Sequence, residues 1–306
     1  MNTRTGTPAP AEPEPVDIPS GRPADLPTPA PGDPRIERLS LNQATVKRAD
    51  LARAVDGCLR AGVPSIGLWR EHVAEAGQER AERMVREAGL RVSSYCRGGF
   101  LTDPARTEQA RESNLRAIDE AAAFGAATLV LVVGGLPDGE RDLRATRARM
   151  AEELEYLVPR AADRGVKLGL EPLHPMFCAD RAVLSTLGQA LDLAKWFPPE
   201  TVGVVVDTYH LWWDPDVYHH IERAGALGRI ASFQVCDWLT PIPDDPLLGR
   251  GMVGDGHIDV RSLHRAVRRA GYEGDVEVEI FNADVWAADS DQVIDTMVRR
   301  HVQYVL

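Results

Sequence analysis

The sequence is poor in cysteine and aromatic residues, and it has no long apolar run. Its four cysteines among 306 residues form no CxxC pair, so neither a zinc cluster nor a disulfide framework is indicated. We therefore expect a reducing, cytoplasmic location. No apolar stretch approaches the roughly 20 residues that a membrane-spanning helix needs, and no apolar stretch of the signal-peptide kind follows the early Arg4. We expect no membrane partner.

Positive charge is also scarce. Thirty-five Lys and Arg residues stand against 46 Asp and Glu residues, which gives a net charge of −11. An acidic surface repels phosphate backbones and anionic lipid, so nucleic acid is excluded as the main partner. The remaining class of partner is a small molecule. The sequence leaves the oligomeric state open, with a homo-oligomer among the allowed states.

Proline is concentrated at the N-terminus. Residues 1–34 hold ten of the 22 prolines, interleaved with Ala, Thr, Asp and Glu. Such a segment cannot bury enough apolar surface to offset the entropy lost on ordering. We predict a disordered or polyproline-II tail over 1–34 and a single domain over 35–306.

After the tail, short apolar runs alternate with longer amphipathic segments rich in Ala, Arg and Glu. We predict strands at 38–42, 65–69, 90–96, 128–134, 167–173, 202–208, 230–237 and 275–281. We predict helices at 49–61, 71–88, 105–124, 143–164, 184–196, 216–224, 260–270 and 290–304. Alternation of this kind forms a parallel sheet, and eight units of this total length indicate an α/β fold, the (β/α)8 TIM barrel. A doubly wound open sheet is the alternative, although no GxGxxG turn follows the first strand.

Four polar residues occupy the ends of consecutive predicted strands: Glu171, Asp207, Gln234 and Glu279. The carboxyl ends of barrel strands carry the chemistry of this fold. Carboxylates gathered there need a cation, since an unpaired buried charge is costly. The all-oxygen donor set favours Mn²⁺ or Mg²⁺ over Zn²⁺, and Co²⁺ would also fit. In the alternative interpretation, Arg or Lys neutralises each acid separately.

Five segments, GLEPLHP, VVVDTYH, SFQVCDW, GRGMVGDGHID and VEVEIF, resemble the sugar phosphate isomerase/epimerase superfamily of xylose isomerase-like TIM barrels. The resemblance covers about residues 36–304 and is to tagatose/psicose 3-epimerases and inosose isomerases. It implies a divalent metal, Mn²⁺ above all, held by the four strand-end residues just named, with Gln234 where many relatives have His. It also implies that Glu171 and Glu279 act as the acid/base pair.

The resemblance and the neighbouring residues suggest further roles. His210, in a DxxH pattern, and Arg250 are expected to bind substrate. His174 would contact substrate or act as a catalytic base. Asp237 is expected to orient the loop after the seventh strand or a ligand at the substrate site, and Trp69 to offer an aromatic face to a sugar.

These features together predict a metal-dependent isomerase or epimerase that moves a proton α to a carbonyl of a ketose, inosose or modified sugar. The alternative is a metal-dependent lyase, similar to C-glycoside deglycosidases, that eliminates an aglycone or water from a 3-oxo-glycoside or inosose. His174 would then be the candidate base. A nuclease is disfavoured because the related endonucleases use a His-rich three-zinc site. Failure to bind metal would leave a non-catalytic binding module.

Overall fold

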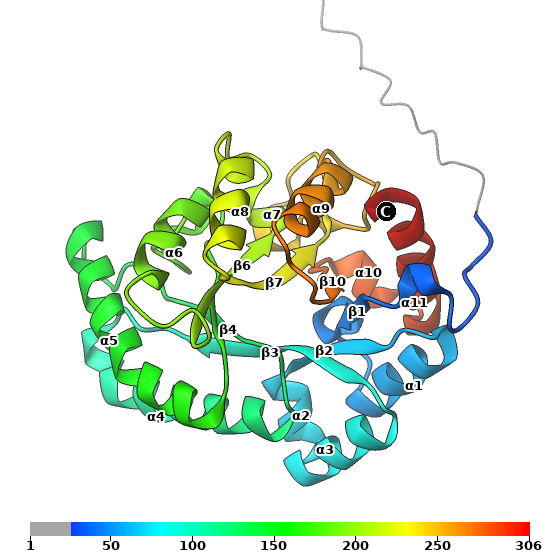
Figure 1. Ribbon diagram of the computed structural model, residues 1–306, viewed down its shortest axis with the longest axis horizontal. Helices are drawn as coiled ribbons and strands as arrows, with labels where there is room; N and C mark the ends of the chain where they lie inside the picture. Colours follow the sequence, from blue (N-terminus) through cyan, green and yellow to red (C-terminus); the bar gives the residue numbers. More distant parts are fainter. Residues whose placement is uncertain (1–25) are drawn as a thin grey trace, which may run out of the picture.

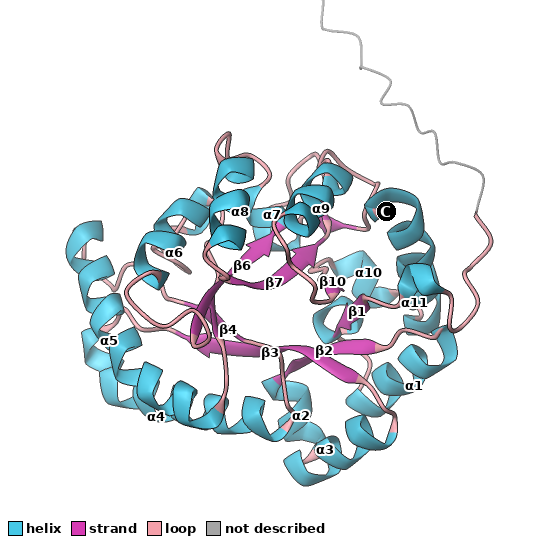
Figure 2. Cartoon of the chain, viewed as in Figure 1, coloured by secondary structure: helices cyan, strands magenta, loops and turns pink. Residues whose placement is uncertain are grey.

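All eight predicted apolar runs form parallel strands in the computed structural model, which describes residues 26–306. They close into a barrel in the order β1-β10-β7-β6-β5-β4-β3-β2. The barrel strands are β1 (Leu39–Asn42), β2 (Ser65–Trp69), β3 (Arg91–Gly99), β4 (Leu129–Val132), β5 (Leu168–Leu170), β6 (Val202–Asp207), β7 (Ile230–Val235) and β10 (Val276–Val278). Helices surround the strands on the outside (Figures 1 and 2). The predicted TIM barrel is confirmed.

The outer helices follow the predicted segments closely. They are α1 (Leu51–Ala61), α2 (Arg70–Ala76), α3 (Gln78–Glu87), α4 (Thr107–Ala123), α5 (Leu143–Arg164), α6 (Leu187–Ala194), α8 (Val217–Ala226), α9 (Val260–Arg269) and α11 (Ser290–Arg300). The segment predicted as one helix at 71–88 is two helices, because Gly77 adopts φ 80° and breaks the helical hydrogen bonding. Two short helices, α7 (Thr208–Leu211) and α10 (Ala283–Ala287), were not predicted.

Side-chain alternation along the strands places polar residues inside the barrel. On β10, Val276 and Val278 alternate with Glu277 and Glu279, and all four are buried. Residues two apart on a strand point the same way, so both glutamates project from one face. In the sheet register, Glu277 is paired with Gln234 of β7, which brings two polar residues together inside the barrel.

A small antiparallel ribbon extends the C-terminal end of β7. It pairs β8 (Asp237–Trp238) with β9 (Arg250–Gly251). The ribbon returns the chain from the loop at 239–249 to the barrel mouth. Its pairing fixes the position of Arg250, which is 2% exposed.

The chain before β1 packs partly on the barrel. Pro29 is buried, and a Cβ atom added to Gly62 would lie 2.5 Å from the Cα atom of Pro31. The described end of the predicted tail therefore contacts the domain, while residues 1–25 lie outside the described part of the chain. None of the helices within 26–306 combines the length and apolar character needed to cross a bilayer.

Candidate active site

The four predicted metal ligands all lie at the carboxyl ends of their strands. Asp207 is the last residue of β6, Gln234 is the last but one of β7, and Glu171 and Glu279 directly follow β5 and β10. Each is at most 5% exposed. The strand pattern thus places three carboxyl groups and one amide at strand ends. Glu171 and Glu279 line the cavity at the barrel mouth, whereas Asp207 and Gln234 are not among its lining residues.

Arg250 lies between two of these carboxylates. Its Nη1 atom is 2.6 Å from Glu279 Oε2 and 3.2 Å from Asp207 Oδ2. Its guanidinium also stacks over the rings of Tyr209 and Phe281, at 4.9 and 4.8 Å from their centroids. Burial opposes the charged form, yet Asp207 and Glu279 raise the pKa of Arg250 overall. The arginine is therefore a fixed cation of the site.

A second group of donors surrounds Glu171. Ligand atoms of Glu171, Asp207 and His210 all lie within 4.8 Å of one another, a spacing suited to one metal ion. The carboxyl groups of Glu171 and Asp207 are therefore close enough for their negative charges to repel each other. Burial, then the charges of Glu279 and Asp207, raise the pKa of Glu171 well above its usual range.

Charge counting favours a divalent cation at this mouth. Glu171, Asp207 and Glu279 bring three negative charges, and Arg250 balances one of them. The pKa of Glu279 is raised to about 7, chiefly by burial and against the opposing effect of Arg250. One divalent ion would balance the other two charges of these three carboxylates and allow all three to ionise. Glu171, Asp207 and His210 therefore fit a divalent metal, whereas Glu279 falls in a separate group of possible donors with Cys96 and Glu277. Glu277 is a fourth buried carboxylate, which only neutral groups contact.

Gln234 is held by a residue that the sequence reasoning overlooked. Its amide nitrogen donates to Glu277 Oε1 over 3.0 Å, and its Oε1 atom is buried without a hydrogen-bond partner among the described residues. A carboxylate accepts hydrogen bonds only, so it fixes which end of the amide faces it. The amide oxygen is thereby left for a cation.

Glu277 itself is fully buried and surrounded by neutral donors. Besides Gln234, it accepts hydrogen bonds from Asn42 at 2.6 Å, Ser93 at 2.5 Å and Ser94 at 2.9 Å. The signal for Glu277 was present in VEVEIF, where a second glutamate two residues before Glu279 faces the same side of the strand.

Asn42 was also missed, although it ends the first predicted strand. Its Nδ2 atom donates to Glu279 Oε1 at 3.0 Å, and its Oδ1 atom accepts a hydrogen bond from Trp69 Nε1 at 2.7 Å. Trp69 lines the cavity that also contains Glu171 and Glu279. Through Asn42, this tryptophan therefore helps to orient the Glu279 carboxylate.

The two predicted histidines are joined. The backbone N–H of His174 donates to Nδ1 of His210 at 3.1 Å, and Arg250 Nη2 lies 3.1 Å from Nε2 of the same ring. A neutral imidazole accepts at one nitrogen only, so both contacts cannot be hydrogen bonds at once. Burial, then Arg250, lower the pKa of His210 and keep it neutral. His210 lines the cavity, whereas His174 is not among the lining residues.

Asp237 uses its carboxylate on backbone groups. It accepts hydrogen bonds from the amides of Trp238 and Ile258 at 2.9 Å and of Gly254 at 2.8 Å. These contacts hold the turn after β9, in line with the predicted role in orienting that loop. Asp237 is not among the residues that line the cavity.

Two arginines that the sequence reasoning did not select also face the cavity, Arg97 at the end of β3 and Arg181 after β5. The Nε atom of Arg181 is buried without a hydrogen-bond partner within the described range. The predicted strand at 90–96 ends directly before Arg97, but no motif marks this residue, and Arg181 reaches the mouth from the loop after β5.

Comparison with known proteins agrees with this architecture. The chain is 27% identical to a ketose 3-epimerase from Arthrobacter globiformis over 195 residues, which cover 63% of this chain and 62% of the epimerase. It is 27% identical to a 3-dehydroshikimate dehydratase from Pseudomonas aeruginosa over 152 residues, 46% of this chain and 22% of the dehydratase. The chain thus matches less than two thirds of the length of either curated relative.

A solved structure is more similar over a longer range. Protein SMc04130 from Sinorhizobium meliloti 1021 superposes with a TM-score of 0.85 at 46% identity, covering 88% of this chain and 98% of that one. The family model described as xylose isomerase-like TIM barrel matches residues 55–300. That match spans all eight strands except β1, and the chain therefore belongs to the xylose isomerase-like TIM barrel family.

Proposed function

We propose that the protein is a divalent-metal-dependent isomerase or epimerase that moves a proton α to the carbonyl of a ketose, inosose or modified sugar. The observation that carries this proposal is that Glu171 and Glu279, from strands on different sides of the mouth, line one cavity with His210 and Arg250. Two carboxylates facing one cavity can serve as an acid and a base in proton transfer. The similarity to a ketose 3-epimerase supports the same class of reaction.

The metal would be held by Glu171, Asp207, Gln234 and Glu279, with Mn²⁺ preferred for a donor set of oxygens. His210 lies within ligand distance of the first two and would be the alternative fourth ligand. A bound divalent ion supplies a Lewis acid that stabilises negative charge developing on the substrate oxygens.

The protein residues would handle the proton. One of the two glutamates removes the proton α to the carbonyl, and the other returns a proton to the opposite face, which inverts that carbon. Return of the proton to the neighbouring carbon would instead interconvert an aldose and a ketose. Arg250 lines the cavity, and its Nε atom, which has no hydrogen-bond partner among the described residues, would donate to a substrate oxygen.

The alternative is a lyase that expels water or an aglycone β to the same carbonyl. The similarity to a 3-dehydroshikimate dehydratase favours it. His174 is poorly placed as its base, since Nδ1 accepts a hydrogen bond from the Met176 amide at 3.3 Å and the ring lies outside the cavity lining. Glu171 or Glu279 would therefore remove the proton in this reaction too.

Proton NMR in D₂O tests the proposal. The Mn²⁺-loaded protein is incubated with ketoses, inososes and 3-oxo-glucosides. Deuterium entering a carbon next to the carbonyl, with a new epimer or isomer, is the expected result. Release of water or an aglycone would instead favour the lyase. Absence of exchange with any of these sugars would contradict both the isomerase or epimerase and the lyase.

A further inference from the structure

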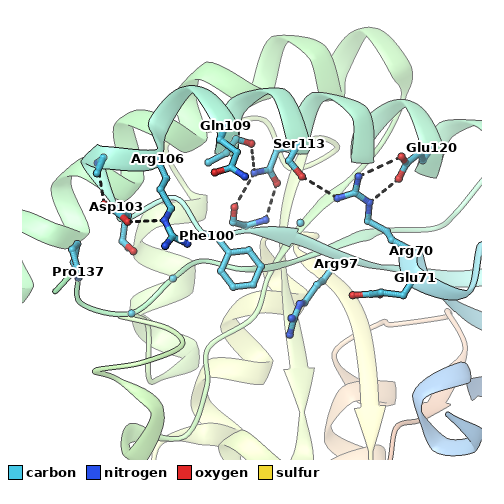
Figure 3. A pocket seen from close by; sticks show the side chains of 18 of the residues that line it. Arg70, Glu71, Arg97, Phe100, Asp103, Arg106, Gln109, Ser113, Glu120 and Pro137 are labelled. Atoms are coloured by element: carbon cyan, nitrogen blue, oxygen red, sulfur yellow. Dashed lines mark hydrogen bonds and ion pairs between the residues drawn. The ribbon is translucent and has the colours of Figure 1, made fainter. Parts of the chain in front are cut away.

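A groove of about 1200 Å³ adjoins the catalytic cavity, which itself has room for only about 40 Å³. Its walls come from α2, the end of β3, α4, and the loop after β4 (Figure 3). The cavity therefore takes only the reacting part of a substrate, and the rest would lie outside it. Known small-molecule pockets measure about 300–1,000 Å³, and the groove is large enough for a substantial group.

Arg97 connects the two spaces, because it lines both. Its guanidinium lies over the rings of Trp69 and Phe100, at 5.6 and 5.1 Å from their centroids. No carboxylate of residues 26–306 forms an ion pair with it, and Glu71 points toward it across the groove (Figure 3). The five N–H donors of this arginine are therefore available at the junction.

Phe100 presents an aromatic face to the groove. Its side chain is 49% exposed, although large apolar side chains are usually buried. Its backbone adopts φ 57°, which is rare for a residue of this size. Hydrogen bonds from the amides of Phe100 and Leu101 to the carbonyl groups of Val132 and Val133 fix this conformation. A strained, firmly held and exposed aromatic residue points to a binding role.

The rest of the groove wall is partly neutralised. Arg70 pairs with Glu120 at 2.7 Å, and Arg106 pairs with Asp103 at 3.4 Å. Because their charges are paired, Arg70 and Arg106 are poor binding sites for an anion. Of the three arginines that line the groove, Arg97 alone is left without an ion pair to the described residues, and the exposed ring of Phe100 beside it suits a group with one flat face and a few polar atoms.

We infer that the substrate is a conjugate, in which the sugar at Glu171 and Glu279 is joined to a second ring that stacks on Phe100 in the groove. The second ring is a sugar or a phenol, since both offer a flat apolar face and hydroxyl groups. Arg97 would donate to the atoms that join the two rings. This inference rests on the proposed function and names the class of substrate for the same site.

The inference that a second ring stacks on Phe100 is tested by the binding of two matched probes. This test does not require turnover. Isothermal titration of the Mn²⁺-loaded protein compares methyl and phenyl 3-oxo-β-glucoside, which differ only in the group directed to the groove. The phenyl compound should bind about fivefold to tenfold more tightly. Phe100→Gly should abolish the difference without backbone conflict, because φ 57° suits glycine, and Phe100→Tyr should keep it.

Trp196→Ala is the control, since Trp196 is 79% exposed at the end of α6, away from the groove lining. Equal affinity for the two probes, or a preference that survives Phe100→Gly, would overturn the inference. Deuterium exchange into the methyl probe is measured separately. Absence of exchange would contradict the proposed function, whereas the ratio of the two affinities tests the inference about the second ring. A 3-oxo-disaccharide then distinguishes a sugar from a phenol as the second ring.

Discussion

The amide nitrogen of Gln234 lies 3.0 Å from Glu277 Oε1, and the amide oxygen at the other end of the group is buried without a partner within the described chain. The carboxylate can only accept, so it acts as an orienting group behind a proposed metal ligand. At this position the chain has an amide together with a glutamate that fixes its direction. Glu277 touches neither cavity nor substrate and is a positioning residue.

Glu277→Gln should weaken metal binding. The new amide can accept or donate, so Gln234 is free to turn its nitrogen toward the ion. Loss of such an orienting partner costs about 10–100-fold in metal affinity. Titration of the apoprotein with Mn²⁺, followed by electron paramagnetic resonance, measures this directly. Glu273→Gln, on the exposed loop before β10, is the control, and equal affinity in both variants would argue against the orienting role.

The sequence predicted the barrel well because each element carries its own signal. The runs at 65–69 and 143–164 coincide with β2 and α5, since apolar patterning and caps act locally. The strand-end acids were found for the same reason. Arg97 and Phe100 were missed because their importance comes from the path of the chain past β4, which no local pattern encodes.

The tryptophans also show what the sequence does not predict, namely the direction in which a side chain points. Five tryptophans lie at or just after predicted strand ends in the sequence: Trp69, Trp212, Trp213, Trp238 and Trp286. Of these, Trp69 alone lines the cavity. Trp238 stacks on Tyr209, with centroids 4.7 Å apart, and Trp286 donates to the Ala44 carbonyl group at 2.7 Å. The sequence predicts that these residues follow strands, but the direction of each ring depends on tertiary packing.

Glu279→Gln should abolish turnover while the fold remains intact. The amide keeps the size of the side chain but cannot take up or return a proton, and loss of a positioned acid or base costs about 10²–10⁴-fold in rate. The exchange rate in D₂O measures the loss, and far-UV circular dichroism checks the fold. A variant with the wild-type rate would remove Glu279 from the acid/base pair.

Arg250→Met should destabilise the metal-free protein more than the metal-loaded one. Without the guanidinium, Asp207 and Glu279 lose their ion-pair partner in the barrel mouth. Breaking a buried pair costs about 3–5 kcal/mol, and a bound cation that selects the folded state offsets part of this cost. Thermal melts of the wild type and the variant, in EDTA and in excess Mn²⁺, give the loss of stability without and with the metal. Equal losses under both conditions would mean that the cation does not bind beside these carboxylates.

His301 should make the fold sensitive to acid independently of the active site. It is 2% exposed, and burial, then the nearby His264, lower its pKa from 6.5 to about 4. Between these values the unfolded chain binds the proton and the folded chain does not, so stability is full above pH 6.5 and falls as the pH drops toward 4. The loss amounts to about 3 kcal/mol at most. Urea unfolding at pH 7 and pH 4.5 should show a smaller decrease for His301→Gln than for the wild type, whereas the exposed His257→Gln should behave as the wild type does. A His301→Gln variant with an undiminished loss would assign the acid sensitivity to other groups.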